Sequence, residues 1–353
     1  MDERTLRLLT LRHLPGFGNH RIASLFRVSG IDALLASPRA YRDQIGEEAV
    51  LALETGAARR QAEAVCEQAT LRSQELIPLG DARYPAALAA IYDPPPVLFV
   101  RGSLENPARR VAIVGARGAT PSGRSLARDL ARGLATHGFE VVSGLARGVD
   151  GAAHEGALSG QGTTLAVLGS GVDIIYPAEH RDLAARIEKK GAVLSEHLPG
   201  TGPAPAHFPS RNRIIVGLSE TVIVVEAGSR SGALITARLA LDEGRDVLAV
   251  PGRPADPLSY GPNLLIRDGA TLVRGLDDVL QHLGVEARPS KNVSSPPDTI
   301  LHHLTASAAR SIDQLAAQTG LTPPAVMVRL AELELEGRVE RLPGTLFRAA
   351  GPA

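Results

Sequence analysis

The stretch VAIVGARGATPSG, residues 111–123, joins a short β-branched run to a glycine-rich loop, as at the first strand and turn of an α/β sheet. Five similar runs follow it, with amphipathic helical segments between them. They are EVVSG (140–144), TLAVLGSG (164–171), AVLSE (192–196), TVIVVEA (221–227) and DVLAVPG (246–252). Continuous apolar strands separated by helices are typical of a parallel sheet covered on both faces. We therefore predict a Rossmann-like, doubly wound, mostly parallel α/β domain over residues 76–284.

The loops that follow these strands are rich in glycine and small hydroxyl residues. They read GARGATPSG, SGLARGVDGAAH, GSGVDIIYP, SEHLPG and EAGSRSGALITA. Ligands of open α/β sheets bind beyond the carboxyl ends of the strands, where small residues let backbone amides approach an anion. Several such loops at one sheet edge predict an extended phosphate-binding surface.

Two further domains are predicted to flank the sheet. Residues 1–75 have helical periodicity throughout, and LPGFGNHRIASLF (14–26) is either a helix-hairpin-helix that meets a DNA phosphate or an ordinary helix–helix turn. A Pro- and Ser-rich linker is predicted at 285–298.

Residues 299–353 read as three helices and a hairpin, which is the pattern of a winged helix. Ser311 is a predicted N-cap, Gly320 a predicted helix stop, and the hairpin turns at Pro343 and Gly344. The third helix carries one arginine against several glutamates, which favours contact with protein over contact with DNA.

Several functional classes lack sequence support. There is no Walker A motif, no HExxH, no GxSxG, and GARG (115–118) is not GxGxxG. Cys66 is the single cysteine, so an internal disulfide or a multi-cysteine metal site is excluded. No secretory signal or long uncharged apolar run is present. We expect a cytoplasmic protein without membrane segments, catalytic residues, metal or cofactor.

The charge is balanced over the whole chain but not locally. There are 38 basic and 38 acidic residues in total, whereas residues 101–147 contain eight arginines and three acidic residues, a net charge of +5. Almost all the positive charge is arginine, which suits binding to phosphate, although genomic base composition also produces such a bias.

Two side chains in these loops are the principal candidates. Arg117 follows the first strand, where its guanidinium either binds a phosphate or forms a surface ion pair. Phe208 lies between prolines and arginines, which favours stacking on a nucleic-acid base over core packing. Asp150 is either an N-cap or a ligand group, and Glu226 is expected to pair with Arg211 or Arg213.

The sequence resembles the DNA-processing protein A (DprA/Smf) family. The resemblance covers residues 84–284 almost without gaps. Its most specific stretches are VGARGATPSG, VVSGLARGVDGAAHEGAL, GSGVDIIYPAEH, HFPSRNRIIVGLSETVIVVEAGSRSGALITA and GPNLLIRDGA. It implies a non-catalytic protein that binds single-stranded DNA and loads the recombinase RecA onto it. It further implies protection of incoming DNA during natural transformation, relief of the block by single-stranded-DNA-binding protein, and a role in recombinational repair.

The resemblance also assigns residues. The DNA-binding set it implies, together with the loop analysis, is Gly115, Arg117, Ser143, Gly144, Arg147, Phe208, Arg211, Asn212 and Arg213. It implies a homodimer through the Rossmann-like domain, with dimer and RecA contacts at Leu264, Leu265 and Ile266. The sequence departs from the family pattern at Pro205, where members commonly have a lysine.

Two alternative functions fit parts of the sequence. A strand-end glutamate in a Rossmann-like fold is found in nucleotide phosphoribohydrolases of the lysine-decarboxylase-like type, but EAGSRSGALITA lacks their PGGxGTxxE pattern. The other alternative is an adaptor whose terminal domains bind proteins.

Overall fold

The computed structural model describes residues 2–28, 30–105, 109–285, 299–304, 309–335, 338–342 and 344–350. The chain divides into two compact units, Met1–Gly284 and Val285–Ala353. The predicted linker lies outside the described residues except for Val285.

The first unit is built on a nine-stranded sheet of order β1-β2-β6-β5-β4-β3-β7-β8-β9. All six predicted runs are strands, and they pair in parallel. They are β3 (Arg110–Val114), β4 (Glu140–Ser143), β5 (Thr164–Val167), β6 (Ala192–Ser195), β7 (Thr221–Val224) and β8 (Asp246–Ala249). The predicted doubly wound, mostly parallel sheet is confirmed.

Three strands were not predicted. β1 (Glu75–Pro78) and β2 (Val97–Gly102) extend one side of the sheet with antiparallel pairing, and β9 (Thr271–Leu272) pairs in parallel with β8. β2 begins with a short apolar run, VLFV, whose residues are all buried. The prolines directly before this run made it hard to recognise as a strand.

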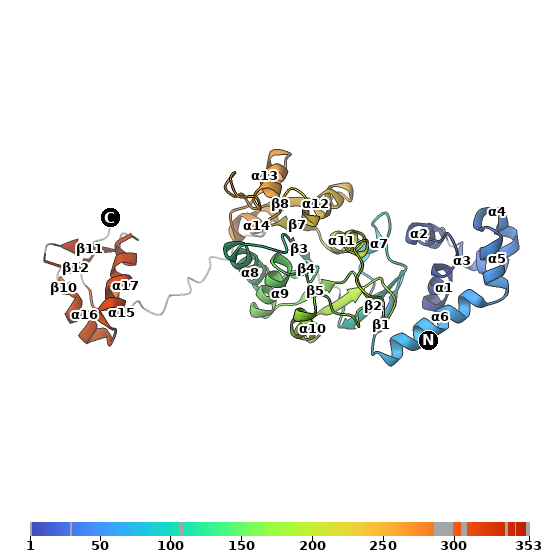
Figure 1. Cartoon of the computed structure of the whole chain (residues 1–353), viewed down its shortest axis with the longest axis horizontal. Helices are drawn as coiled ribbons and strands as arrows, with labels where there is room; N and C mark the ends of the chain where they lie inside the picture. Colours follow the sequence, from blue (N-terminus) through green and yellow to red (C-terminus); the bar gives the residue numbers. More distant parts are fainter. Residues whose placement is uncertain are drawn as a thin grey trace. The chain divides into compact units, whose positions relative to one another are not determined.

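Helices cover both faces of this sheet (Figure 1). On one face, α8 (Pro121–Thr136) packs against α9 (Val149–Ser159), which lies on β3, β4 and β5. On the other, α11 (His207–Leu218) packs against α12 (Gly232–Asp242), which lies on β7 and β8. The remaining elements are α7 (Ala86–Ala89), η2 (Ala178–His180), α10 (Arg181–Glu188), α13 (Tyr260–Arg267) and α14 (Leu276–His282). Because both faces are covered, every residue of β3 is buried.

The amino-terminal part of this unit is helical, as predicted. It contains α1 (Glu3–Arg12), α2 (Asn19–Arg27), α3 (Ile31–Ala36), η1 (Pro38–Tyr41), α4 (Arg42–Ile45), α5 (Glu47–Glu54) and α6 (Ala57–Leu71). Its apolar residues join those of the sheet in one hydrophobic core. The division at residue 75 therefore stays a prediction.

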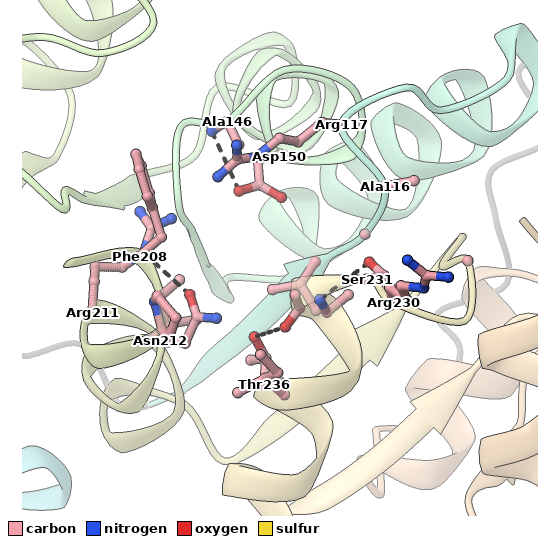
Figure 2. A pocket seen from close by; sticks show the side chains of 18 of the residues that line it. Ala116, Arg117, Ala146, Asp150, Phe208, Arg211, Asn212, Arg230, Ser231 and Thr236 are labelled. Carbon is pink, nitrogen blue, oxygen red and sulfur yellow. Dashed lines mark hydrogen bonds between the residues drawn. The ribbon is translucent and has the colours of Figure 1, made fainter. Parts of the chain in front are cut away.

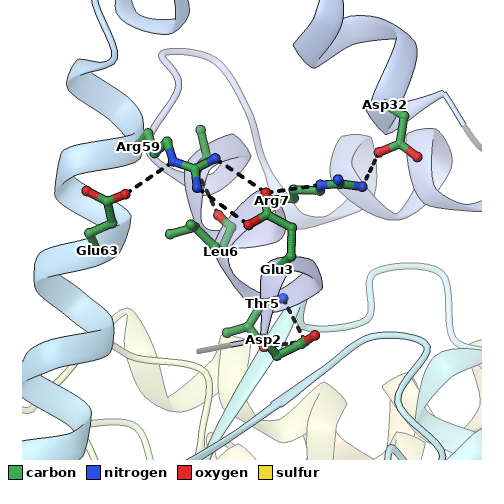
Figure 3. A network of polar contacts seen from close by, with 9 residues as sticks. Asp2, Glu3, Thr5, Leu6, Arg7, Asp32, Arg59 and Glu63 are labelled. Carbon is green, nitrogen blue, oxygen red and sulfur yellow. Dashed lines mark hydrogen bonds and ion pairs between the residues drawn. The ribbon is translucent and has the colours of Figure 1, made fainter.

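Surface ion pairs link three of these helices (Figure 3). Arg59 of α6 contacts Glu3 of α1 at 3.3 Å and Glu63 at 3.2 Å, and Arg7 contacts Asp32 of α3 at 2.6 Å. Exposed pairs of this kind contribute little to stability, so the shared apolar core holds the helices together.

The second unit has the predicted winged-helix arrangement. It comprises α15 (Thr299–His302), β10 (Arg310–Ser311), α16 (Ile312–Thr319), α17 (Pro323–Leu335), β11 (Val339–Leu342) and β12 (Leu346–Ala349), with strand order β10-β12-β11. Ser311 caps α16 in a reciprocal capping box with Gln314, and Gly320 ends that helix in the left-handed conformation. Pro343 lies outside the described residues.

Candidate nucleic-acid interface

The strand order reverses at β3. The chain proceeds from β3 through β4 and β5 to β6 on one side, and then crosses to β7 on the other. The loops that follow β3 and β7 diverge at this switch point, where α/β sheets bind ligands. Between them lies a cavity of about 610 Å³, lined by the β3–α8, β4–α9 and β7–α12 loops and by α11. We call it the switch-point cavity.

The β3–α8 loop is closely packed at its start. A side chain at Gly115 would come within 2.5 Å of Val149, and the Ala116 amide donates to the Glu226 carbonyl at 2.7 Å. The Glu226 carboxylate accepts from the amide of Thr120, the N-cap of α8, at 2.8 Å. The predicted pairing of Glu226 with Arg211 or Arg213 is therefore wrong, because this carboxylate fixes the start of α8.

Arg117 is exposed in this loop, next to the exposed Gly118. Its guanidinium carbon lies 4.8 Å from the centre of the Phe208 ring, in a cation–π contact. No carboxylate lies within ion-pair distance of it in the described parts of the chain. Of the two predicted alternatives, the surface ion pair is absent, so the guanidinium is available to an anion.

The β4–α9 loop is organised around two buried charged side chains, Asp150 and Arg211. Asp150, in the first turn of α9, accepts from the amides of Gly144 and Ala146 at 3.2 and 3.3 Å. Arg211 donates to the carbonyl of Gly144 at 2.7 Å and to that of Val167. Burial raises the pKa of Asp150, and the charge of Arg211 opposes this shift. Asp150 thus shapes the loop, and the N-cap position itself is Gly148.

Two predicted DNA-binding residues serve this packing. A side chain at Gly144 would meet the Arg211 guanidinium at 2.5 Å, so glycine is required for Arg211 to enter. The Ser143 hydroxyl is fully buried and donates to the carbonyl of Ile113 at 2.7 Å. The Ser143 side chain is therefore not accessible to a strand of DNA.

Helix α11 forms one wall of the cavity. Figure 2 shows Phe208, Arg211 and Asn212 projecting from this helix, with Ser231 and Thr236 across from them. Phe208 is half-buried, which contradicts the core alternative, and its ring lies 5.7 Å from that of Tyr176. The Arg211 side chain is almost fully buried, and burial lowers its pKa to about 10, so the group stays charged at neutral pH.

Arg213 lies away from the cavity. Its guanidinium forms ion pairs with Glu196 and, at 3.2 Å, with Asp93. Asn19 of α2 donates to the same Glu196 carboxylate at 2.7 Å, and Arg12 of α1 donates to the Glu196 carbonyl at 2.5 Å. Arg213 therefore joins α11 to the amino-terminal helices, and its role as a DNA contact stays a prediction.

Arg147 and Arg230 differ in their partners. Arg147 is exposed and forms a two-pronged pair with Glu179 at 2.5 and 2.7 Å. Arg230 lies in the β7–α12 loop at the cavity, is exposed, and has no carboxylate within ion-pair distance among the described residues. Sequence reasoning noted this loop but did not select Arg230 or Tyr176; an arginine between two serines after a strand was the signal available.

The remaining predicted residues lie elsewhere. Leu264, Leu265 and Ile266 belong to α13 and are half-buried, with Leu265 packed against the core. Pro205 is exposed and lines a hollow adjoining Phe208 and Tyr176. His154 is fully buried, and its Nδ1 lies 2.8 Å from the Thr164 hydroxyl oxygen, which gives this histidine a structural role.

The described residues contain neither a metal site nor a membrane-spanning helix. No group of three or more His, Cys, Asp or Glu side chains is placed to hold a metal ion there. No helix among them is long and apolar enough to cross a membrane.

Comparison with known proteins places the chain in a family. The model for DNA recombination-mediator protein A matches residues 75–284, and that for the DprA winged-helix domain matches residues 284–345. The chain is 40% identical to Protein Smf of Escherichia coli over 78% of each protein. It is 38% identical to the putative DNA processing protein DprA of Mycobacterium tuberculosis over 91% of this chain and 88% of that protein.

Solved structures agree. The X-ray structure of DprA from Streptococcus pneumoniae matches with a TM-score of 0.69 at 36% identity, over 80% of this chain and 98% of that one. DprA from Helicobacter pylori, whose structure is described as giving insight into its single-stranded DNA binding mode, matches with a TM-score of 0.54 at 31% identity, over 59% and 95% of the chains. On its sequence, its fold and its two matched domains, this chain belongs to the DNA recombination-mediator protein A (DprA/Smf) family.

Proposed function

We propose that the switch-point cavity binds single-stranded DNA without catalysing a reaction on it. One observation carries this proposal: the exposed guanidinium of Arg117, which has no carboxylate partner in the described residues, lies against the half-exposed ring of Phe208 at the switch point. A cation beside an aromatic face provides the two contacts that sequence-independent binding of a single strand uses, phosphate attraction and base stacking. The single-strand binding of the Helicobacter pylori relative supports the same function.

Each residue has a distinct part in this proposal. Arg117 and Arg230 contact phosphates, while Phe208 and Tyr176 offer their rings to bases. Asn212 and the glycine-rich loop around Gly115 supply polar atoms at the cavity edge. Gly144, Ser143 and Arg211 hold the β4–α9 loop in shape, and Arg147 contributes only when it leaves Glu179.

The binding constant of the full-length protein for an oligothymidylate, measured over a range of salt concentrations, tests this function. Because phosphate contacts release counterions, log K should fall with log salt concentration by about 0.7 per neutralised phosphate. A duplex of the same length serves as the control and should bind more weakly, since its bases are not free to stack. A flat salt dependence would contradict the proposal.

We further propose that the bound strand is handed to RecA and that the protein acts as a cytoplasmic homodimer. This rests on the family to which the chain belongs and on the half-exposed apolar residues of α13. Substitution of Ile266 by Arg should convert dimer to monomer in analytical ultracentrifugation. RecA assembly on an oligonucleotide coated with single-stranded-DNA-binding protein should accelerate with the wild-type protein; an unchanged assembly rate would contradict the loading role.

A further inference from the structure

A second hollow, of about 360 Å³, adjoins the loop that carries Tyr176. Its lining comes from β2, from the β5–α10 connection and from one face of α10, and includes Arg101, Asp173, Ile174, Arg181 and Glu188. We call it the Arg181 hollow. None of these residues takes part in the site described above.

The acidic residues of the Arg181 hollow are already paired. Glu188 lies 3.2 Å from Arg101, and Asp173 lies 3.1 Å from Arg72. The Asp173 carboxylate also accepts from the amide of Gly200 at 2.9 Å. Neither carboxylate is therefore left to neutralise a further cation.

Arg181 is exposed, and within the described ranges no carboxylate lies close enough to pair with it. It is the first residue of α10, where the helix dipole disfavours a positive charge. Helix stability therefore does not explain an arginine at this position. An anion bound in the Arg181 hollow would explain this arginine.

One loop, residues 173–176, carries both Ile174 of the hollow and Tyr176 beside Phe208. Tyr176, which contacts Phe208, is two residues from Ile174, so their Cα atoms are at most about 7 Å apart. The loop is held in place, because the Ser170 hydroxyl donates to the Ile174 carbonyl at 2.6 Å and the Gly171 amide to the Thr201 carbonyl at 2.9 Å. The Ile174 side chain is 36% exposed and offers apolar surface beside the arginine.

From this arrangement we propose that a single strand of DNA leaving Phe208 passes over Tyr176 into the Arg181 hollow, where Arg181 binds a phosphate and Ile174 contacts a sugar or base. The proposal rests on the proposed function, because it extends the same binding path. It makes the length of DNA that the protein engages greater than the switch-point cavity alone can hold.

The test uses oligothymidylates of two lengths, about 6 and about 20 nucleotides, with the full-length protein. Arg181→Gln should leave the affinity for the short oligomer unchanged and weaken binding of the long one about three- to tenfold. It should also reduce the salt slope for the long oligomer by about 0.7, the value for one phosphate contact. Arg186→Gln is the matched control, because Arg186 is exposed on the same helix but does not line the hollow; it should change neither affinity.

The outcomes separate this proposal from the one it extends. If Arg117→Ala weakens both oligomers but Arg181→Gln weakens neither, the DNA site stands and the extended path is wrong. If Arg181→Gln and Arg186→Gln weaken binding of the long oligomer equally, the loss reflects only the change in net charge. That result would also overturn the proposal. If the wild-type protein binds neither oligomer, the proposed function and its extension both fall.

Discussion

The two sides of α11 use the same side-chain chemistry for opposite purposes. On the side of the switch-point cavity, Phe208 is half-buried and the nearby guanidinium of Arg117 has no acidic partner in the described residues. On the other side, the Arg213 side chain is 12% exposed and neutralised by Glu196 and Asp93. Both residues are arginines, so residue type does not distinguish their roles. Burial and the presence of carboxylate partners distinguish an arginine that stabilises the fold from one that is free to bind a ligand.

The largest effect is expected on the side away from the cavity. Arg213→Met leaves the Glu196 carboxylate buried without this partner and should lower the free energy of unfolding by about 3–5 kcal/mol. The double variant Arg213→Met with Glu196→Gln should recover part of that loss, because residue 196 then no longer carries a buried charge that has lost its Arg213 partner. Chemical denaturation measures the free energy of unfolding of both variants. If Arg213→Met is as stable as the wild type, Arg213 does not hold the fold as the comparison states.

The next effect concerns the cavity side and affinity. Phe208→Ala should weaken binding of an oligothymidylate by about 1–3 kcal/mol, which is about 5- to 150-fold, because one base loses its stacking surface. Phe208→Tyr keeps the ring and should bind nearly as well. Fluorescence anisotropy measures the affinity of both variants for the oligothymidylate. If Phe208→Ala binds as tightly as the wild type, base stacking on Phe208 does not contribute to binding.

A smaller effect is expected for the paired arginine at the cavity rim. Glu179→Gln frees Arg147 from its exposed ion pair and should strengthen single-strand binding by up to about threefold. Arg147→Ala, by contrast, should change the affinity little, since its charge is already neutralised. If Glu179→Gln binds single-stranded DNA more weakly than the wild type, the ion pair with Glu179 does not hold Arg147 away from DNA.

The smallest effect is a dependence of stability on pH near Arg213. Burial lowers the pKa of His197 to about 4; Glu196 opposes this shift, and His207, Arg12 and Arg213 add to it. As pH falls below about 6.5, the unfolded chain binds a proton at this histidine before the folded chain does, so stability is lost between about 6.5 and 4. The ring is partly open to solvent, and we expect less than about 1 kcal/mol. His197→Gln should flatten this part of the thermal-unfolding profile; an identical profile would exclude His197.

Strand positions and loop chemistry could be predicted from the sequence because both are local. Six apolar runs and the glycine-rich loops after them define the parallel sheet and its carboxyl edge, and hence where Arg117 and Phe208 meet. β1 and β2 were missed because prolines interrupt the sequence around a short apolar run.

Side-chain partners were harder to predict because they depend on packing between distant segments. Helical periodicity alone would have placed Phe208, Arg211 and Asn212 on one side of α11 and Arg213 on another. The sequence does not reveal that Glu196 meets Arg213 or that Glu226 meets Thr120, since these contacts form only when β6 and β7 take their places in the sheet.

The most direct test of the central claim compares two arginine variants under the same conditions. The affinity of Arg117→Ala and Arg213→Met for an oligothymidylate would be measured across salt concentrations, with the folded fraction of each determined by circular dichroism. We predict that Arg117→Ala binds at least about tenfold more weakly, with a salt slope reduced by about 0.7 and unchanged thermal stability. Folded Arg213→Met should bind as the wild type does. Loss of binding in folded Arg213→Met together with normal binding in Arg117→Ala would contradict the account.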